Sequence, residues 1–267
     1  YITRKRLRIS HLPNKTAKNN LPIIYLAPMA GISDFPFRKL VSSFGVGNVV
    51  SEMVASKSIA SNLAEFSKKL KSINNFEKSV VQIVGSNPDW MAEAAKYVES
   101  MGCNIIDINM GCPAKKVNKT YAGAALMKDL DFAKKIIDSV VRAVNIPVTL
   151  KMRLGWDQDN KNALFLSRIA EDSGVKMVTI HARTRCQFYN NKANWSEISE
   201  ISKNIEIPVL VNGDIVCSKS ARKALLDSDA DGFMVGRGAR GKPWLLNQIY
   251  YSLLENKTEF KKPECPI

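Results

Sequence analysis

The sequence has few cysteines and histidines and no long apolar run. Its 267 residues include five cysteines, none in a C-x-x-C pair, and two histidines. Neither a disulfide framework nor a zinc site is therefore expected, and a reducing cytoplasm is the simplest location. The longest apolar stretch, residues 21–30, is broken by prolines and falls well short of the roughly 18 residues that a membrane helix needs. No apolar segment follows the basic N-terminal residues, which argues against a secretory signal but leaves a transit peptide open.

Acidic residues are scarce relative to basic ones. There are 39 Lys and Arg against 25 Asp and Glu, which gives a formal net charge of +14. Such an excess points to a polyanionic partner, either nucleic acid or an anionic membrane surface, although a generally basic proteome would give the same number. With 45% hydrophobic and 24% charged residues, the chain has the composition of a globular protein with one large domain or two small ones.

Short β-branched runs alternate with amphipathic stretches along the chain. The expected strands are residues 23–27, 48–51, 80–84, 105–109, 148–152, 177–181, 209–211 and 232–235. The expected helices are residues 37–44, 59–70, 90–101, 132–144, 163–173, 195–203, 220–226 and 243–254. Eight βα units in about 250 residues predict an α/β fold of the (β/α)8 TIM-barrel type. A doubly wound sheet is the alternative.

Polar side chains recur near the carboxyl ends of these strands. In residues 148–153, apolar residues alternate with Thr149, Lys151 and Arg153, and alternate side chains point to opposite faces of a strand. The polar residues at corresponding places in five other strands are Glu52, Gln82, Asp107, Asn109, Thr179, His181, Arg183 and Asn212. A barrel would gather them inside the end that carries active sites. The alternative is that polarity simply begins where strands end.

Lys151 is the most informative of these residues. A lysine that points into a barrel needs an anion to offset its desolvation, and a bound anionic cofactor would supply one. Snorkelling toward solvent is the alternative. It suits Arg153 better than Lys151, because Arg153 lies one step closer to the mouth.

Cys112 follows the fourth expected strand, between a glycine and a proline. A cysteine thiol in ordinary surroundings is mostly protonated at neutral pH, so it can donate a proton. No histidine is near it in sequence, which argues against a protease-type Cys–His pair. An inert loop cysteine is the alternative. His181 is either a core histidine or, by its parity in the strand, a neighbour of Lys151 inside the barrel.

Two glycine-rich loops follow the last two expected strands: Asn212-Gly213-Asp214 and residues 236–241. Loops at these positions of a barrel often bind phosphate, because glycine lets backbone N–H groups approach it closely. The second loop reads G-x-G-x-x-G, but no strand follows to complete a dinucleotide-binding unit. We interpret the pair as a mononucleotide phosphate site, with tight turns as the alternative.

Basic residues are concentrated in the same loops. They are Lys115, Lys116, Lys119, Arg153, Arg183, Arg185, Lys192, Arg237 and Arg240. Scattered surface charge would not prefer one face, so we expect a polyanionic substrate there. Tyr121, Phe188 and Tyr189 lie in these loops and either stack on bases or pack within the loops.

Six segments together resemble the tRNA-dihydrouridine synthase family, most closely its bacterial B class. They are residues 27–34 (APMAGISD), 109–113 (NMGCP), 150–156 (LKMRLGW), 180–185 (IHARTR), 212–215 (NGDI) and 236–239 (GRGA). Each motif is weak alone, but together and in the family's order they are specific. They cover roughly residues 23–250.

The resemblance implies a barrel that binds FMN across its mouth. The residues implied to hold FMN are Pro28, Met29, Ala30, Gln82, Lys151 and His181 around its ring and Asn212, Gly213, Asp214, Gly236 and Arg237 around its ribityl phosphate. Cys112 matches the family's proton donor. Asn109 would orient the base, and Arg153 and Arg183 would hold the substrate's phosphates or edge.

The implied reaction is NADPH-driven reduction of the C5=C6 bond of uridines in the D-loop of tRNA. C6 accepts a hydride because it is conjugated to a carbonyl, and Cys112 would then protonate C5. Lys151 would favour the anionic reduced ring. The uridine has to leave its stack to reach the flavin, which agrees with a deep basic mouth.

The family also carries a C-terminal helical domain, of which only the beginning fits here. We therefore expect a barrel over residues 1–250 and the truncated start of that domain over residues 251–267, or else weaker tRNA binding than usual. Two rival functions stay open. One is an FMN barrel reductase acting on a free pyrimidine, which would not need so many basic loop residues. The other is a non-catalytic RNA-binding barrel.

Overall fold

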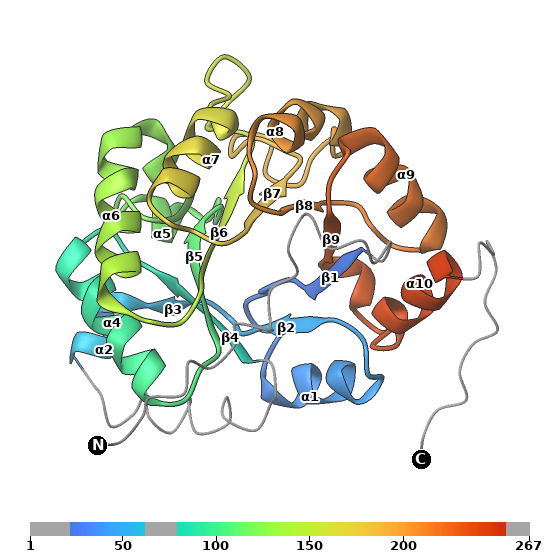
Figure 1. Cartoon of the computed structure of the whole chain (residues 1–267), viewed down its shortest axis with the longest axis horizontal. Helices are drawn as coiled ribbons and strands as arrows, with labels where there is room; N and C mark the ends of the chain where they lie inside the picture. The colour runs from blue at the N-terminus through green and yellow to red at the C-terminus, as the bar shows by residue number, and fades with distance from the viewer. Residues whose placement is uncertain (1–21, 62–78, 255–267) are drawn as a thin grey trace, which may run out of the picture.

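A computed structural model describes residues 22–61 and 79–254 of the chain, and within them eight parallel strands close into a barrel (Figure 1). The strands are β1 (Ile23–Leu26), β2 (Asn48–Val50), β4 (Ser79–Val84), β5 (Ile105–Met110), β6 (Val148–Arg153), β7 (Val178–His181), β8 (Val209–Asn212) and β9 (Gly232–Val235). The ring closes because β1 pairs with both β2 and β9 while β2 pairs with β4. The expected (β/α)8 barrel is confirmed, and the doubly wound sheet is excluded.

The helices form an outer ring around the strands, as Figure 1 shows. They are α1 (Phe35–Ser43), α2 (Ser56–Ser61), α4 (Pro88–Ser100), α6 (Leu130–Ala143), α7 (Ala163–Asp172), α8 (Ser199–Asn204), α9 (Ser218–Ser228) and α10 (Leu245–Leu254). The short α5 (Lys115–Asn118) lies instead in the segment between β5 and α6. The 3-10 helices are η1 (Gly123–Lys128), η2 (Trp195–Ile198) and η3 (Arg237–Ala239). The expected helix 195–203 is divided between η2 and α8. The expected helix 59–70 begins within α2, but residues 62–70 lie outside the described residues.

Local sequence signals fix where several of these elements begin and end. Asp34 and Asn87 cap α1 and α4 by accepting a hydrogen bond from a backbone N–H in the first turn. Gly45, Gly102 and Gly174 follow three of the helices with positive φ angles of 77°, 84° and 94°, which is the conformation that favours glycine after a helix. One short strand, β3 (Val54–Ala55), was not expected; it pairs with the end of β4.

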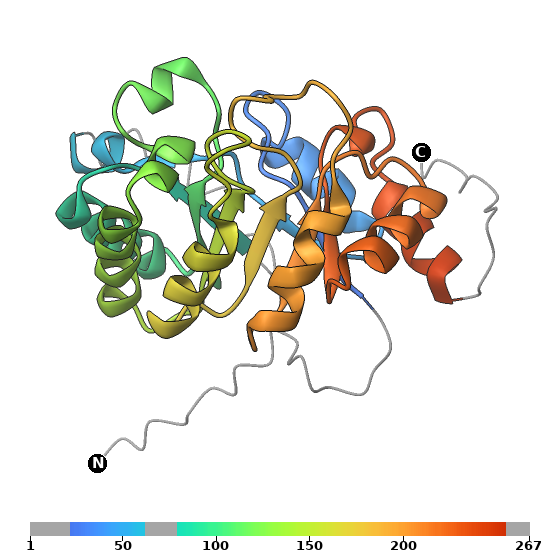
Figure 2. The same ribbon diagram turned by 90° about the horizontal axis from the view of Figure 1, so that it is seen from above.

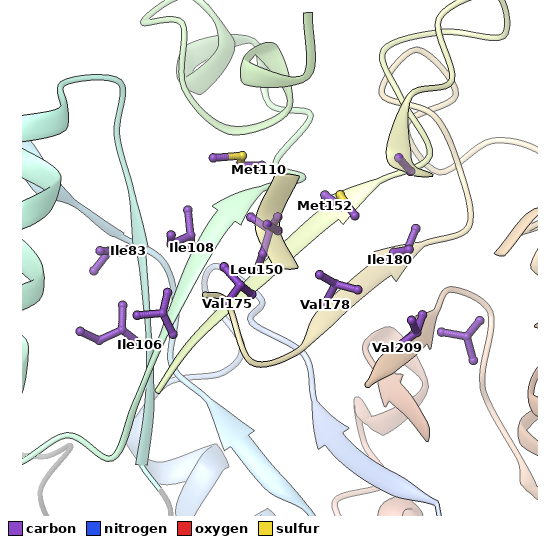
Figure 3. Packing of buried hydrophobic residues seen from close by; sticks show 14 of the residues in the cluster. Ile83, Ile106, Ile108, Met110, Leu150, Met152, Val175, Val178, Ile180 and Val209 are labelled. Carbon is purple, nitrogen blue, oxygen red and sulfur yellow. The ribbon is translucent and has the colours of Figure 1, made fainter. Parts of the chain in front are cut away.

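The barrel has an apolar outer face, an apolar floor and a polar upper interior. Side chains such as Ile108, Leu150 and Ile180 point outward from neighbouring strands and pack in the core under the helices (Figure 3). A second buried cluster fills the interior and includes Val80 and Ile105. Further along the same strands, polar residues replace these apolar ones. The alternation read from the sequence therefore places the polar set inside, toward the mouth.

The last described helix belongs to the barrel. α10 packs against α9 and β1, and Nδ2 of Asn247 donates to the carbonyl oxygen of Phe44 over 2.7 Å. The boundary expected after residue 250 falls inside this helix, which continues to Leu254. Residues 255–267 lie outside the described residues, so the helical domain stays a prediction. Within the described ranges, no helix has the length and apolarity to cross a membrane.

Candidate active site at the barrel mouth

Two adjoining cavities open at the carboxyl ends of the strands, with volumes of about 320 and 480 Å³. Both volumes lie in the range of about 300–1,000 Å³ that is usual for ligand sites. The residues that line both cavities are Pro28, Met29, Lys151, His181, Tyr189 and Arg237. In Figure 2 the segments that follow β5 and β7 rise on one side of the barrel, above the strand ends.

Fourteen of the fifteen residues expected at the site line one cavity or both. The smaller cavity adds Asn212, Gly213, Asp214 and Gly236, the expected phosphate residues. The larger cavity adds Ala30, Gln82, Asn109, Cys112 and Arg153. Arg183 lines neither. The structure thus brings the two glycine loops and the loop of Cys112 together, although more than 100 residues of sequence separate Cys112 from Gly236.

A chain of side-chain amides leads to the loop of Cys112. Nδ2 of Asn109 donates to Oε1 of Gln82 over 2.7 Å. Oδ1 of Asn109 accepts from the backbone N–H groups of Gly111 and Cys112 over 3.0 and 2.9 Å. Asn109 therefore fixes the backbone at Cys112, which lines the larger cavity.

The same series of hydrogen bonds continues from Gln82 into the barrel to the carboxylate of Asp107. The sequence predicted that Asp107 points inside the barrel but gave it no function. Asp107 is only 2% exposed. Its Oδ2 accepts from Nε2 of Gln82 over 2.7 Å, and its Oδ1 accepts from the hydroxyl of Thr149 over 2.6 Å. The signal in the sequence was its parity with Asn109 on one strand, but its partners became clear only from the pairing of β5 with β4 and with β6.

Lys151 lies between the two cavities and lines both. Burial, helped by the positive charge of Arg153, lowers the pKa of Lys151 to about 8, while the negative charge of Asp107 opposes the shift. The ammonium group therefore keeps most of its charge at neutral pH and loses it in mildly alkaline solution. An anionic ligand placed beside it would stabilise the charged form.

His181 is held in its neutral form. Burial lowers its pKa well below the usual 6.5, and the cations Arg153, Lys151 and Arg183 lower it further. Nη1 of Arg183 lies 3.2 Å from Nε2 of His181. Because a guanidinium group only donates, Nε2 is the acceptor and the ring proton sits on Nδ1. His181 thus faces the shared part of the two cavities as an uncharged ring.

Arg153 ties three loop carbonyls together inside the mouth. Its Nε donates to the Gly111 oxygen over 2.8 Å, and its Nη1 donates to the Thr184 and Phe188 oxygens over 2.9 and 2.8 Å. The side chain is only 1% exposed, so the suggestion that it snorkels toward solvent is wrong. These bonds leave Nη2 as the nitrogen available to a substrate, and the expected substrate contact stays a prediction.

Arg183 is equally buried, at 2% exposed, and joins the loops after β7 and β8. Its Nη2 lies 2.6 Å from both Oδ2 of Asp214 and the carbonyl oxygen of Asn191, and its Nε donates to the carbonyl oxygen of Asn190. With His181 at Nη1, all three nitrogens have partners within the protein. This geometry favours a structural function over the expected substrate contact.

The two glycine-rich loops depend on close packing that only glycine allows. Gly213 has a φ of +115°, and a Cβ there would lie 2.9 Å from Cδ2 of His181. A Cβ on Gly238 would collide with the carbonyl oxygen of Ile215, which brings η3 against the loop after β8. Asp214 adopts a φ of 55°. These contacts and angles account for the glycines as tight turns, and the phosphate site stays a prediction.

The loop that carries Pro28, Met29 and Ala30 is held from below. Oε1 of Glu52, at the end of β2, accepts from the backbone N–H of Gly31 over 2.5 Å. The hydroxyl of Ser33 accepts from the N–H of Met29 over 2.8 Å. Glu52 was recognised in the sequence as a polar strand end, and its function here is to fix this loop at the edge of the larger cavity.

The aromatic loop residues divide between packing and the site. Tyr121 packs on Phe132, with 5.9 Å between the ring centroids. Tyr189 is 51% exposed and lines both cavities, with the guanidinium of Arg237 4.6 Å from its ring centroid. Phe188 packs under Arg185 at 4.7 Å. Phe188 also lines the larger cavity, so Phe188 and Tyr189 are both placed to meet a ligand, whereas Tyr121 is not among the lining residues of either cavity.

Most of the expected basic collar is exposed on the rim. The exposed members are Lys115, Lys116, Lys119, Lys192, Arg237 and Arg240. Arg185 is half-buried: its Nε donates to Oδ1 of Asn118, and it also packs on Trp156. The rim therefore presents cations around the opening, while the two buried arginines hold its loops.

A closed parallel barrel with a polar cavity and basic rim at the carboxyl ends of its strands is typical of a (β/α)8-barrel enzyme. A family model described as dihydrouridine synthase matches residues 25–266. The chain therefore belongs to the dihydrouridine synthase family.

Named relatives agree with this membership. A probable tRNA-dihydrouridine synthase of Rickettsia prowazekii is 52% identical over 91% of this chain and 74% of its own length. A tRNA-dihydrouridine synthase B of Vibrio cholerae is 44% identical over 95% of this chain and 77% of its own length. The solved structure of histamine dehydrogenase from Rhizobium sp. 4-9 matches with a TM-score of 0.61 at 14% identity, over 87% of this chain and 46% of that one. At that identity the likeness supports the fold alone.

Proposed function

We propose that this protein is a tRNA-dihydrouridine synthase that uses FMN and NADPH to reduce the C5=C6 bond of uridines in the D-loop of tRNA. The observation that carries the proposal is the meeting of Cys112, Lys151 and the two glycine loops around adjoining cavities. Family membership and the names of the relatives support the reaction and its substrate class. They argue against the rival reading as a reductase of free pyrimidines.

The residues present fit FMN. The smaller cavity offers a cradle at Gly213, where a Cβ would fill the space beside His181, and Arg237 supplies a positive charge at its edge. The shared region offers the apolar Pro28 and Met29 against one side of a flat ring and the ammonium of Lys151 near its polar edge. The donor set thus suits a phosphate at one end and an anionic ring at the other.

FMN, when bound, supplies the hydride that C6 of the uracil ring accepts, and NADPH restores it. Within the chain, Cys112 holds the proton that C5 receives, because its thiol lines the cavity that adjoins the flavin residues. Asn109 keeps the Cys112 backbone in place through its hydrogen bond of 2.9 Å. Lys151 supplies positive charge where the two cavities meet, close to both the flavin and the uracil ring.

The rim residues suit a polyanionic substrate. A uridine enters such a cavity only after leaving its stack, and the flanking phosphates then remain at the rim. The exposed cations Lys115, Lys116 and Lys119 stand beside the loop of Cys112, where they would meet those phosphates. Arg153 and Tyr189 line the cavity itself, where a flipped base would lie.

The proposal is tested by incubating the purified chain with FMN, NADPH and tRNA from a strain that lacks dihydrouridine. We expect FMN to give a yellow protein and mass spectrometry to find dihydrouridine at D-loop positions. Equal turnover of free uridine would favour the pyrimidine reductase. A protein that stays colourless with added FMN would favour a non-catalytic RNA-binding barrel.

A further inference from the structure

Asp107 is a buried carboxylate that the proposed reaction does not use. It lies one layer below the cavity, 2% exposed. Its two oxygens accept from neutral groups, Nε2 of Gln82 and the hydroxyl of Thr149. Burying a carboxylate this deeply is costly, and desolvation accordingly raises its pKa. The negative charge of Asp107 acts on Lys151, but that charge does not explain why both of its oxygens are hydrogen-bonded to Gln82 and Thr149.

The explanation lies in which group donates and which accepts along the hydrogen bonds from Asp107 through Gln82 and Asn109 to the Cys112 loop. An amide side chain has a donor end and an acceptor end and can turn over, so its orientation depends on its partners. At the lower end, Asp107 Oδ2 accepts and therefore draws the nitrogen of Gln82. At the upper end, the backbone N–H groups of Gly111 and Cys112 donate and therefore draw the oxygen of Asn109. Both ends impose the same order on the two amides.

The orientation of the two amides decides which of their polar groups face the larger cavity. Gln82 and Asn109 both line the larger cavity. Each amide nitrogen carries two hydrogens, and these hydrogen bonds use one of them. The nitrogen of Asn109 also donates to the sulfur of Met53 over 3.8 Å. With the acceptor at position 107 removed, Gln82 can turn over. Its nitrogen would then face the nitrogen of Asn109, and Asn109 could relieve the clash only by giving up its bonds to the Cys112 loop.

We propose that Asp107 is a positioning residue that orients Gln82 and Asn109 and thereby fixes the loop that carries Cys112. The inference rests on the proposed function where it concerns proton donation, but the ordering of the loop does not. Only the acceptor oxygen at position 107 matters for this ordering. An asparagine can supply that oxygen to Gln82 while its amide nitrogen donates to the hydroxyl of Thr149.

The test measures how fast iodoacetamide alkylates Cys112 in the full chain without FMN, followed by peptide mass spectrometry. We expect Asp107→Leu to raise the rate by about tenfold, the factor that one lost hydrogen bond allows. Asp107→Asn should keep the rate of the unaltered protein. Thr149→Val is the matched control: it removes the other donor to Asp107 but leaves Gln82 bound, so its rate should also be unchanged.

Two other cysteines calibrate the experiment. Cys103 is buried and Cys217 is exposed, so unchanged alkylation of Cys103 shows that the barrel of each variant stays folded. An unchanged Cys112 rate in folded Asp107→Leu overturns the proposal, as does an Asp107→Asn variant that behaves like Asp107→Leu. If Asp107→Leu does not fold, Gln82→Met breaks the same chain one step higher. The Cys112 rate in that variant must then rise, and no rise overturns the proposal.

Activity separates this inference from the proposed function. If the unaltered protein reduces tRNA, Asp107→Leu should lower kcat by about 10- to 100-fold, as misplacing a reacting group does. Asp107→Asn keeps the acceptor oxygen but loses the negative charge that acts on Lys151, so its kcat should lie clearly above that of Asp107→Leu. If the unaltered protein does not reduce tRNA, the proposed function fails while the alkylation rates still decide the ordering of the loop. Altered alkylation with unchanged kcat would overturn the catalytic part of the inference.

Discussion

Arg183 and Asp214 join two loops of the barrel mouth: Nη2 of the arginine lies 2.6 Å from Oδ2 of the aspartate. Arg183 is buried after β7, whereas the Asp214 side chain is 31% exposed after β8. The other oxygen of the same carboxylate lies 3.7 Å from Arg237, whose side chain is 59% exposed. One carboxylate thus contacts a buried arginine and an exposed arginine. We expect the buried one, Arg183, to stabilise the loops and the exposed one, Arg237, to contribute to ligand binding.

Removing the buried arginine should destabilise the protein. Arg183→Met removes the close cationic partner of Asp214, which keeps its bond from the Ala193 N–H, and removes the bonds to the Asn190 and Asn191 carbonyls. We expect the free energy of unfolding to fall by about 2–4 kcal/mol in urea titrations. Arg237→Met, with its exposed and longer contact, should cost less than about 1 kcal/mol but should weaken FMN binding. Equal destabilisation by the two variants would contradict this division.

Cys112→Ala should separate flavin binding from turnover. The thiol lines the larger cavity but is absent from the lining of the smaller one, so FMN colour and reduction by NADPH should persist. Turnover with tRNA should fall by about 100- to 10,000-fold, the usual contribution of a general acid. Cys186→Ala is the control, because Cys186 is exposed on the loop after β7. Unchanged turnover in Cys112→Ala would remove this cysteine from the mechanism.

The pKa of Lys151 predicts the pH dependence of FMN affinity. Because burial lowers this pKa to about 8, the ammonium is mostly charged at neutral pH and becomes neutral as the pH rises. An anionic ligand favours the charged form, so FMN affinity should fall above about pH 8, by up to about tenfold per pH unit. His181 is already neutral there, because its pKa lies well below 6.5. Anaerobic titration with reduced FMN, whose ring is anionic, should show this fall in the unaltered protein and its loss in Lys151→Met. An unchanged fall in Lys151→Met would assign it to another group.

The rim cations predict a steep dependence of tRNA binding on salt. Lys116 and Lys119 are exposed beside the Cys112 loop, so Lys116→Gln and Lys119→Gln should each reduce the slope of log affinity against log salt by about 1. Lys134→Gln is the matched control, because Lys134 lies on α6 and pairs with Asp138 at 2.6 Å. Filter binding across a salt series measures all three variants. Equal slopes for the rim variants and the control would place the tRNA elsewhere.

The barrel and the inward polar residues were predictable because they depend on periodicities of single segments. Eight buried apolar runs predict eight strands. The alternation of side chains along each strand alone places Lys151 and Asn109 on the inner face. The glycine loops were predictable for the same reason, since position after a known strand of a barrel fixes their place. The family motifs then added the roles of individual residues.

The functions of the buried arginines were not predictable, because their partners are loop carbonyls. Arg153 donates to the carbonyl oxygen of Gly111, and Arg183 donates to that of Asn191. In the loop after β7, Phe188 and Asn191 adopt positive φ angles of 49° and 59°. No sequence signal marks such angles in residues other than glycine. Similarly, the partners of Asp107 come from neighbouring strands. Its hydrogen bonds therefore depend on how the strands are aligned with one another, which the sequence of a single strand does not show.

The central claim is that one mouth brings a reduced flavin and a uridine of tRNA together. Its most direct test is a single turnover without oxygen: the FMN-loaded protein is bleached with one equivalent of NADPH and then mixed with tRNA that lacks dihydrouridine. The account predicts that the flavin absorbance returns with formation of one dihydrouridine per flavin, and that free uridine gives no such return at the same concentration. A flavin that stays bleached with tRNA, or that recovers equally fast with free uridine, would contradict it.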